Sequence, residues 1–204
     1  MIDFKLKQTS LEVVQNILEN NEEVISIEVI SHKVGINWRQ LHGSEQDKIQ
    51  NINHAFDHPK PCKRKIYSRE EFLGLTLNSL EKIAADEVWS VCSRVKCFGG
   101  KYKHIPMMNF HLEDVSLDVV KKSLKYILPT TRGVILESGR FFHYYGASLL
   151  SENEWRKFMA EFLMPCVLVS PRYIGHRLYA GYCSLRLTTD ITYKTKVPEV
   201  VDIF

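Results

Sequence analysis

A Ser-Gly step followed by a histidine is the pattern in this sequence best suited to phosphate chemistry. It lies in residues 137–145, which read ESGRFFHYY. A tight Ser-Gly turn can present a hydroxyl and backbone N–H groups to an anion, and a histidine on the following strand can add a donor. The plainer alternative is a hairpin whose glycine permits the turn and whose histidine packs between aromatic rings. We take Ser138, Arg140 and His143 as candidate phosphate ligands.

A second candidate is an arginine on an alternating strand near the C-terminus. Residues 185–188 read LRLT, and Lys194 follows. An arginine can bind a triphosphate or a template phosphate through two parallel hydrogen bonds. The alternative is a surface arginine on a half-buried strand. Arg186 and Lys194 therefore join the candidate phosphate ligands.

A basic segment precedes that strand. Arg172, His176 and Arg177 occur close together, with Tyr173 and Tyr179 between and beside them. Cations and aromatic rings together can neutralise and stack a nucleic-acid strand. The same residues would also suit a helix end, where cations oppose the backbone carbonyls. We predict nucleic-acid contacts for the three cations and keep this alternative open.

Another segment offers metal ligands and basic residues. His54, His58 and Cys62 recur every four residues. One helix would bring them to one face for zinc, but Pro59 and Pro61 interrupt it, and a fourth ligand is missing. The basic run that follows fits either a nucleic-acid backbone or a solvated loop; it consists of Lys60, Lys63, Arg64 and Lys65.

Composition is that of a globular cytoplasmic protein. The 204 residues are 45% hydrophobic and 25% charged, with a net charge of +3 and five scattered cysteines. That charge is too small to indicate nucleic-acid binding alone. Neither a bilayer-length apolar run nor a secretory leader is evident, so membrane association and secretion are not expected. P-loop, dinucleotide-binding and nucleophile-elbow patterns do not occur.

The elements that must position these residues follow from hydrophobic spacing and helix caps. We predict helices at 10–20, 68–85, 116–128 and 151–164, strands at 23–31, 88–96, 105–112, 133–137, 140–145 and 182–188, a polar loop or a short helix and loop at 44–66, and a connection between Pro165 and Pro171. The order predicts an α+β fold, with a mixed or antiparallel sheet packed against helices. We expect a single domain over 1–204, comprising an N-terminal α/β portion (1–87) and a core portion (88–204).

Taken in order, segments of the core portion resemble the motifs of the archaeo-eukaryotic primase superfamily. In that family, one motif is a Ser-Gly-x-x-x-His element beside the nucleotide phosphates, which Ser138 and His143 match. A later Leu-Arg strand with a downstream lysine matches Arg186 and Lys194. The resemblance covers roughly residues 88–200. It implies a primase-like core that binds a nucleotide or a single-stranded or template nucleic acid, with a role in DNA replication.

The acidic positions of that family are changed here. Its first motif has two acids on one strand face, where this chain has Asn109 and His111; its third motif has one acid, where this chain has Ser170. Two-metal phosphoryl transfer needs carboxylates to bind Mg²⁺. Asparagine and serine are neutral and weak ligands, and histidine prefers softer metals. We therefore expect no polymerase activity and predict no cofactor.

Three alternatives remain open. Glu113 and Asp114 lie just beyond the first motif and, in a shifted register, would bind Mg²⁺ or Mn²⁺ in an active primase-polymerase or nucleotidyltransferase. His111 with other groups would instead bind one transition metal. The chain would also serve as a protein-interaction module with a protein partner, because a fold does not fix a function.

Overall fold

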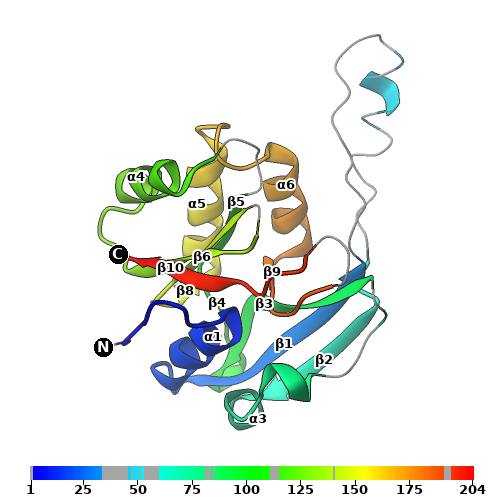
Figure 1. Ribbon diagram of the computed structural model, residues 1–204, viewed down its shortest axis with the longest axis vertical. Helices are drawn as coiled ribbons and strands as arrows, with labels where there is room; N and C mark the ends of the chain where they lie inside the picture. Colours follow the sequence, from blue (N-terminus) through cyan, green and yellow to red (C-terminus); the bar gives the residue numbers. More distant parts are fainter. Residues whose placement is uncertain are drawn as a thin grey trace.

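Two antiparallel sheets form the framework of the computed structural model, which describes residues 2–33, 46, 48–50, 52, 60–80, 84, 86–110, 115–139, 141–190 and 194–204 (Figure 1). The larger sheet has the order β2-β1-β3-β4-β8, and β9 also pairs with β3. The smaller sheet has the order β10-β6-β7-β5. All strand pairs with a described register are antiparallel. The α+β prediction is confirmed.

The strands of the larger sheet are β1 (Val24–Lys33), β2 (Lys63–Ser68), β3 (Glu87–Cys97), β4 (Tyr102–His104), β8 (Leu150–Ser151) and β9 (Ser184–Arg186). Those of the smaller sheet are β5 (Met107–Phe110), β6 (Gly133–Glu137), β7 (Phe142–Gly146) and β10 (Glu199–Ile203). The helices are α1 (Ser10–Glu19), α3 (Arg69–Leu73), α4 (Leu117–Ile127), α5 (Glu152–Leu163) and α6 (Pro171–Ala180).

Helices α1 and α3 lie on the same side of the larger sheet (Figure 1). Helix α1 begins at a capping box in which Thr9 and Glu12 satisfy each other's backbone N–H groups. Its buried apolar residues recur at helical spacing, so one face joins the core. Ile27 and Val29 of β1 belong to the same hydrophobic cluster. These residues of β1 and the apolar face of α1 therefore belong to one hydrophobic core.

The smaller sheet packs against α5 through aromatic rings. Tyr144 of β7 contacts Phe158, and Phe110 of β5 contacts Phe162. Gly133 of β6 and Gly146 of β7 are paired across the sheet, beside the Tyr144 ring. A Cβ atom on Gly133 would come within 2.4 Å of the Tyr144 ring, so only glycine leaves room for it. The opposite side of the sheet approaches β9, because β5 and β9 are in contact.

The structure corrects the helix predicted over 68–85. Helix α3 ends at Leu73, Gly74 is its C-cap, and Leu77–Ser79 forms a separate turn of 3₁₀-helix. Thr76 caps that turn by accepting from the N–H of Ser79, which starts a new element instead of continuing the first. Residues 81–83 and 85 lie outside the described residues.

Several elements were not predicted, among them the short strands β4 and β8. Strand β2 falls at the end of the segment predicted as a loop, because this edge strand is basic and lacks alternating apolar residues. Helix α6 begins where the predicted connection ends, in a segment for which no element was predicted: Pro171 stands in its first turn, where a missing N–H costs nothing. Strand β10 was not predicted either. The other predicted helices and the predicted strands, which correspond to β1, β3, β5, β6, β7 and β9, are confirmed to within a few residues.

One hydrophobic cluster connects the helices and both sheets, from Leu11 of α1 to Val200 of β10. Within the described ranges, the structure contains no helix with the length and hydropathy of a membrane span.

Candidate functional site

The turn between β6 and β7 is closed by Ser138. Its N–H and its hydroxyl both donate to the carbonyl of Phe141, at 2.8 Å and 2.9 Å. Gly139 has a φ of 101°, a conformation that side chains other than hydrogen rarely permit. The predicted Ser-Gly turn is therefore present, and the Ser138 hydroxyl is buried and engaged in it.

The guanidinium of Arg186 connects β9 to this turn. Nη2 donates to the Ser138 carbonyl at 2.7 Å, and Nη1 donates to the carbonyls of Thr188 and Lys196 at 2.7 Å and 2.6 Å. The residue is only 6% exposed. Burial lowers the pKa of Arg186 to about 10, and the Asp190 carboxylate opposes that shift. Arg186 thus anchors two loops, and both terminal nitrogens of its guanidinium already donate to backbone carbonyls.

His143 lies at the centre of β7, paired with Asn109 of β5 on one side and Leu136 of β6 on the other. It is 5% exposed. Burial, followed by the positive charges of Arg186 and Lys194, lowers the pKa of His143 to about 3. The imidazole is therefore neutral near pH 7. Its Nδ1 atom has no hydrogen-bond partner among the described residues.

Lys194 lies above the same turn. Its N–H donates to Asp190 at 3.0 Å, and its ammonium is 5.3 Å from the centroid of the Phe141 ring. The structure therefore brings together four of the five candidate phosphate ligands, Ser138, His143, Arg186 and Lys194. We call these four residues the inter-sheet site, because Arg186 of β9 in the larger sheet bonds the β6–β7 turn of the smaller sheet. Arg140, the fifth, lies outside the described residues.

The positions that replace the family's acids are only partly described. Asn109 lies directly opposite His143 in the β5–β7 register. Ser170 is the N-cap of α6, although its side chain makes no capping hydrogen bond. His111, Glu113 and Asp114 lie outside the described residues. Among the residues that are described, no group of three or more His, Cys, Asp or Glu side chains could hold a metal ion.

The predicted nucleic-acid contacts, Arg172, His176 and Arg177, all lie on α6 and are half-buried. Nη1 of Arg177 donates to the Ser184 hydroxyl of β9 at 3.2 Å. Burial lowers the pKa of His176, and the charges of Arg172 and Arg177 add to that effect. Helix α6 is therefore a cationic element attached to the larger sheet.

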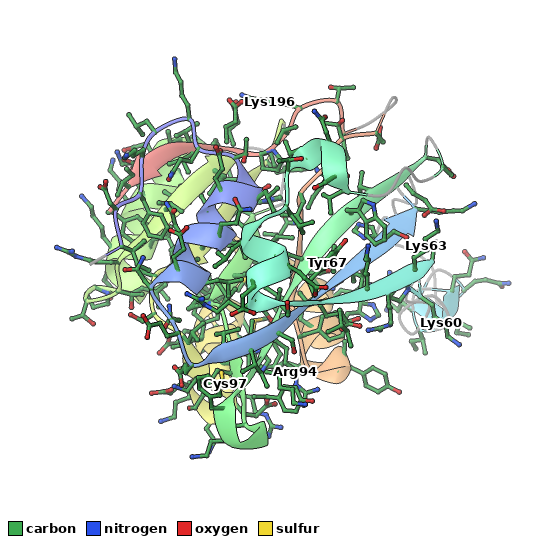
Figure 2. The ribbon with its side chains drawn as sticks, turned by 90° about the horizontal axis from the view of Figure 1, so that it is seen from below. Lys60, Lys63, Tyr67, Arg94, Cys97 and Lys196 are labelled. Carbon is green, nitrogen blue, oxygen red and sulfur yellow. The ribbon has the colours of Figure 1, made fainter. Side chains whose placement is uncertain are left out.

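Only part of the segment that offered zinc ligands and a basic run is described. His54 and His58 lie outside the described residues, whereas Cys62 is exposed just before β2. Figure 2 shows Lys60 and Lys63 near one end of β2, away from Arg94 and Cys97 at the far end of β3. Arg64 points to the other face of the sheet from its neighbours, bonded to Glu28 at 2.8 Å and to the Tyr182 hydroxyl at 3.1 Å.

Sequence reasoning missed two polar groups. Asp190 is buried beside Arg186, and its place just after the Leu-Arg strand was the available signal. Ser93, His104 and Glu152 also form a chain: the Ser93 hydroxyl is 3.2 Å from His104 Nδ1, and His104 Nε2 is 3.0 Å from Glu152. Ser93 is fully buried and accepts the N–H of Cys183, so this trio is structural; no spacing pattern indicated it.

Comparison with known proteins gives one result. A family model described as AEP-like, archaeo-eukaryotic primase 1D-like, matches residues 71–199, which is more than half of the chain. The matched range contains the whole inter-sheet site and helix α6. A search of curated proteins and a search of solved structures gave no significant match.

Proposed function

Because the chain belongs to the archaeo-eukaryotic primase-like family, we propose that it binds a nucleotide or nucleic acid at the inter-sheet site and does not polymerise nucleotides. The observation that carries this proposal is the convergence of Ser138, His143, Arg186 and Lys194 around one buried, neutral imidazole. The positive charges of Arg186 and Lys194 lower the pKa of that imidazole. The Asp190 carboxylate stabilises the charged form of Arg186. A bound phosphate would place a negative charge beside these two cations.

The members have different roles in the proposal. Arg186 positions the β6–β7 turn, because its donors are already used by carbonyls. Lys194 is half-buried, so its ammonium can meet a phosphate from solvent. His143 is neutral and adds a donor without the cost of burying a further charge. Electrostatic attraction is stronger here than at a fully solvated surface, since nearby protein replaces water.

The absence of polymerisation is proposed from chemistry. Two-metal catalysis needs carboxylates to hold the ions that stabilise the attacking and leaving oxygens. Asn109 lies beside the imidazole in register, and Ser170 begins α6; neither can supply a negative charge. A nucleotide can still bind at such a site through its phosphates.

Calorimetric titration with a nucleoside triphosphate at low salt tests the binding. We expect saturable binding that Lys194→Ala weakens by roughly tenfold or more, because hydrogen bonds to charged groups contribute about 1.5–3 kcal/mol. Lys196→Ala is the matched control: Lys196 lies two residues away, is exposed and pairs with Glu137. The proposal would be refuted if the protein bound neither a triphosphate nor a short single strand.

Primer-extension assays with Mg²⁺ and with Mn²⁺ test the second half of the proposal. We expect no incorporation with either ion. Incorporation that disappears in Glu113→Ala or Asp114→Ala would show instead that the chain is an active nucleotidyltransferase.

A further inference from the structure

The larger sheet has a second face, opposite α1 and α3, that carries cations and an aromatic ring. In the β3–β4 register, Lys96 pairs with Tyr102 and Arg94 pairs with His104. Residues two apart on a strand share a face, so Arg94, Lys96 and Tyr102 lie on the same side. We call these three residues the outer-face cluster. Val95 and Lys103 pair on the opposite side, where Lys103 bonds Glu23 at 2.7 Å.

The cluster is exposed and electrostatically unbalanced. The guanidinium carbon of Arg94 lies 3.9 Å from the centroid of the Tyr102 ring, and Tyr102 is 45% exposed. Arg94 and Lys96 are also exposed. Within the described part of the chain, neither cation has an acidic partner. The cluster therefore combines a solvent-facing ring with two cations that no described carboxylate neutralises.

This face continues toward α6. Cys92 lies two residues before Arg94 on the same strand, and the charges of Glu28, Arg64 and Arg177 all act on its thiol. Arg64 reaches the Tyr182 hydroxyl, which adds a second aromatic residue. Arg177, one of the charges that act on the Cys92 thiol, belongs to α6. The cations of this face therefore extend from the β3–β4 hairpin toward α6.

The acids beside this face are already engaged. Glu28 pairs with Arg64 at 2.8 Å. Glu152 bonds His104 at 3.0 Å and pairs with Arg156 at 3.3 Å. The charge that remains on the face is positive, which matches a polyanion.

We propose that the outer-face cluster binds single-stranded nucleic acid along the larger sheet. Arg94 and Lys96 neutralise backbone phosphates, and a base stacks against the Tyr102–Arg94 pair. Sheet surfaces that expose aromatic rings between cations bind unpaired bases in this way. In a duplex the base faces are stacked inside the helix, so a duplex would contact Arg94 and Lys96 through its phosphates but could not stack a base on Tyr102. An acidic peptide offers negative charge but no base to stack.

This inference rests on the proposed function for its class of ligand, but it concerns different residues. The inter-sheet site is proposed to hold phosphates of a nucleotide between the sheets. The outer-face cluster is proposed to hold the strand. Loss of one site should therefore leave the other measurable.

Fluorescence anisotropy with a labelled twelve-nucleotide single strand tests the proposal. We expect the double variant Arg94→Ala/Lys96→Ala to weaken binding and to lower the slope of log affinity against log salt by about 1.4, since each phosphate contact on a single strand contributes about 0.7. Tyr102→Ala should weaken binding at least about fivefold, because a stacked base contributes at least that factor. Lys103→Ala, on the same strand but the opposite face, is the matched control and should bind normally.

Unchanged affinity for the single strand in the Arg94, Lys96 and Tyr102 variants would overturn the proposal, as would an equal loss of affinity in Lys103→Ala. It would also be overturned if polyglutamate bound as tightly as the single strand and Tyr102→Ala left that affinity unchanged. Triphosphate titration separates this test from the earlier one. If the double variant still binds triphosphate but not the strand, both proposals stand. If it binds both normally, only the outer-face proposal fails.

Discussion

Arg186 and Arg94 lie on the same large sheet, yet they are opposite kinds of arginine. Arg186 is 6% exposed and donates to carbonyls of the segment between β9 and β10 and of the β6–β7 turn. Arg94 is exposed and contacts a tyrosine ring. The buried arginine resembles the family pattern, whereas the exposed one belongs to no motif that the sequence offered. A motif residue can thus shape a site, while a residue outside any motif remains available to a ligand.

The difference follows from solvation. A buried guanidinium must have its donors satisfied, because an unpaired buried charge is very costly. The carbonyls of Ser138, Thr188 and Lys196 satisfy Arg186, and that arrangement fixes the turn on which His143 depends. An exposed guanidinium has water as its partner and exchanges it cheaply for a phosphate. We therefore assign fold stability to the inter-sheet arginine and strand binding to the outer-face arginine.

The largest expected effect is on Arg186. Arg186→Met removes the donors of several buried carbonyls, and we expect the free energy of unfolding in urea to fall by about 3 kcal/mol or more. Arg94→Met is the matched control and should change that free energy by less than about 0.5 kcal/mol. Equal effects of the two substitutions would show that the buried and the exposed arginine contribute alike to stability.

The next effect is a pH dependence from His143. Its folded pKa of about 3 lies below the usual 6.5 of an unfolded chain, held there by burial and by Arg186 and Lys194. As pH falls below 6.5, His143 becomes protonated in the unfolded chain but stays neutral in the folded chain. The free energy of unfolding therefore declines toward pH 3. Between pH 6.5 and 5 this amounts to about 1.6 kcal/mol, because the unfolded imidazole is only half protonated at pH 6.5.

Urea unfolding at several pH values measures that slope. His104 and His176 also have lowered pKa values, so the informative quantity is the difference between the wild type and His143→Asn. We expect the variant to lose most of the His143 contribution. An unchanged slope would mean that the imidazole at 143 is hydrated and protonates normally.

Much of the fold could be predicted from the sequence, because capping boxes and apolar spacing are local signals. The boxes at Ser68 and Ser151 mark real helix starts. The length of the helix from Ser68 could not be predicted, since Gly74 and the Thr76 cap end it against a continuing apolar pattern. Strand β2 was missed because an edge strand is specified by its partner β1 and not by its own apolar residues.

The candidate site was predictable only as a set of residues. The pattern of Ser138, His143 and Arg186 indicated that they would meet, and they do. Their hydrogen bonds could not be predicted, because the carbonyls that occupy Arg186 come from backbone, which carries no sequence signal. The outer-face cluster was missed for a related reason: Arg94 and Tyr102 meet through strand register, which spacing along the chain does not give.

A smaller effect is expected at Ser138. Ser138→Ala removes the hydroxyl bond to Phe141 while leaving the backbone bond of the same pair in place. We expect a loss of about 1 kcal/mol in the free energy of unfolding, the usual worth of one hydrogen bond. Ser79→Ala, in an exposed turn, is a control expected to cost less. If Ser138→Ala leaves stability unchanged but reduces triphosphate binding, the hydroxyl is a ligand and the inter-sheet site is less closed than its hydrogen bonds indicate.

The smallest expected effect on stability is at the outer face. Arg94→Ala/Lys96→Ala removes two exposed cations that have no described acidic partner, so unfolding free energy should change by less than about 0.5 kcal/mol. The Arg94–Tyr102 contact is exposed to solvent, so its contribution should lie at the lower end of the range of about 0.5–1 kcal/mol for exposed cation–π pairs. Tyr102→Ala, measured alone and combined with Arg94→Ala, isolates that contact as a coupling energy. A coupling well above 1 kcal/mol would show that the outer-face cluster holds the β3–β4 hairpin together, and the division between a structural interior and an available surface would then fail at this point.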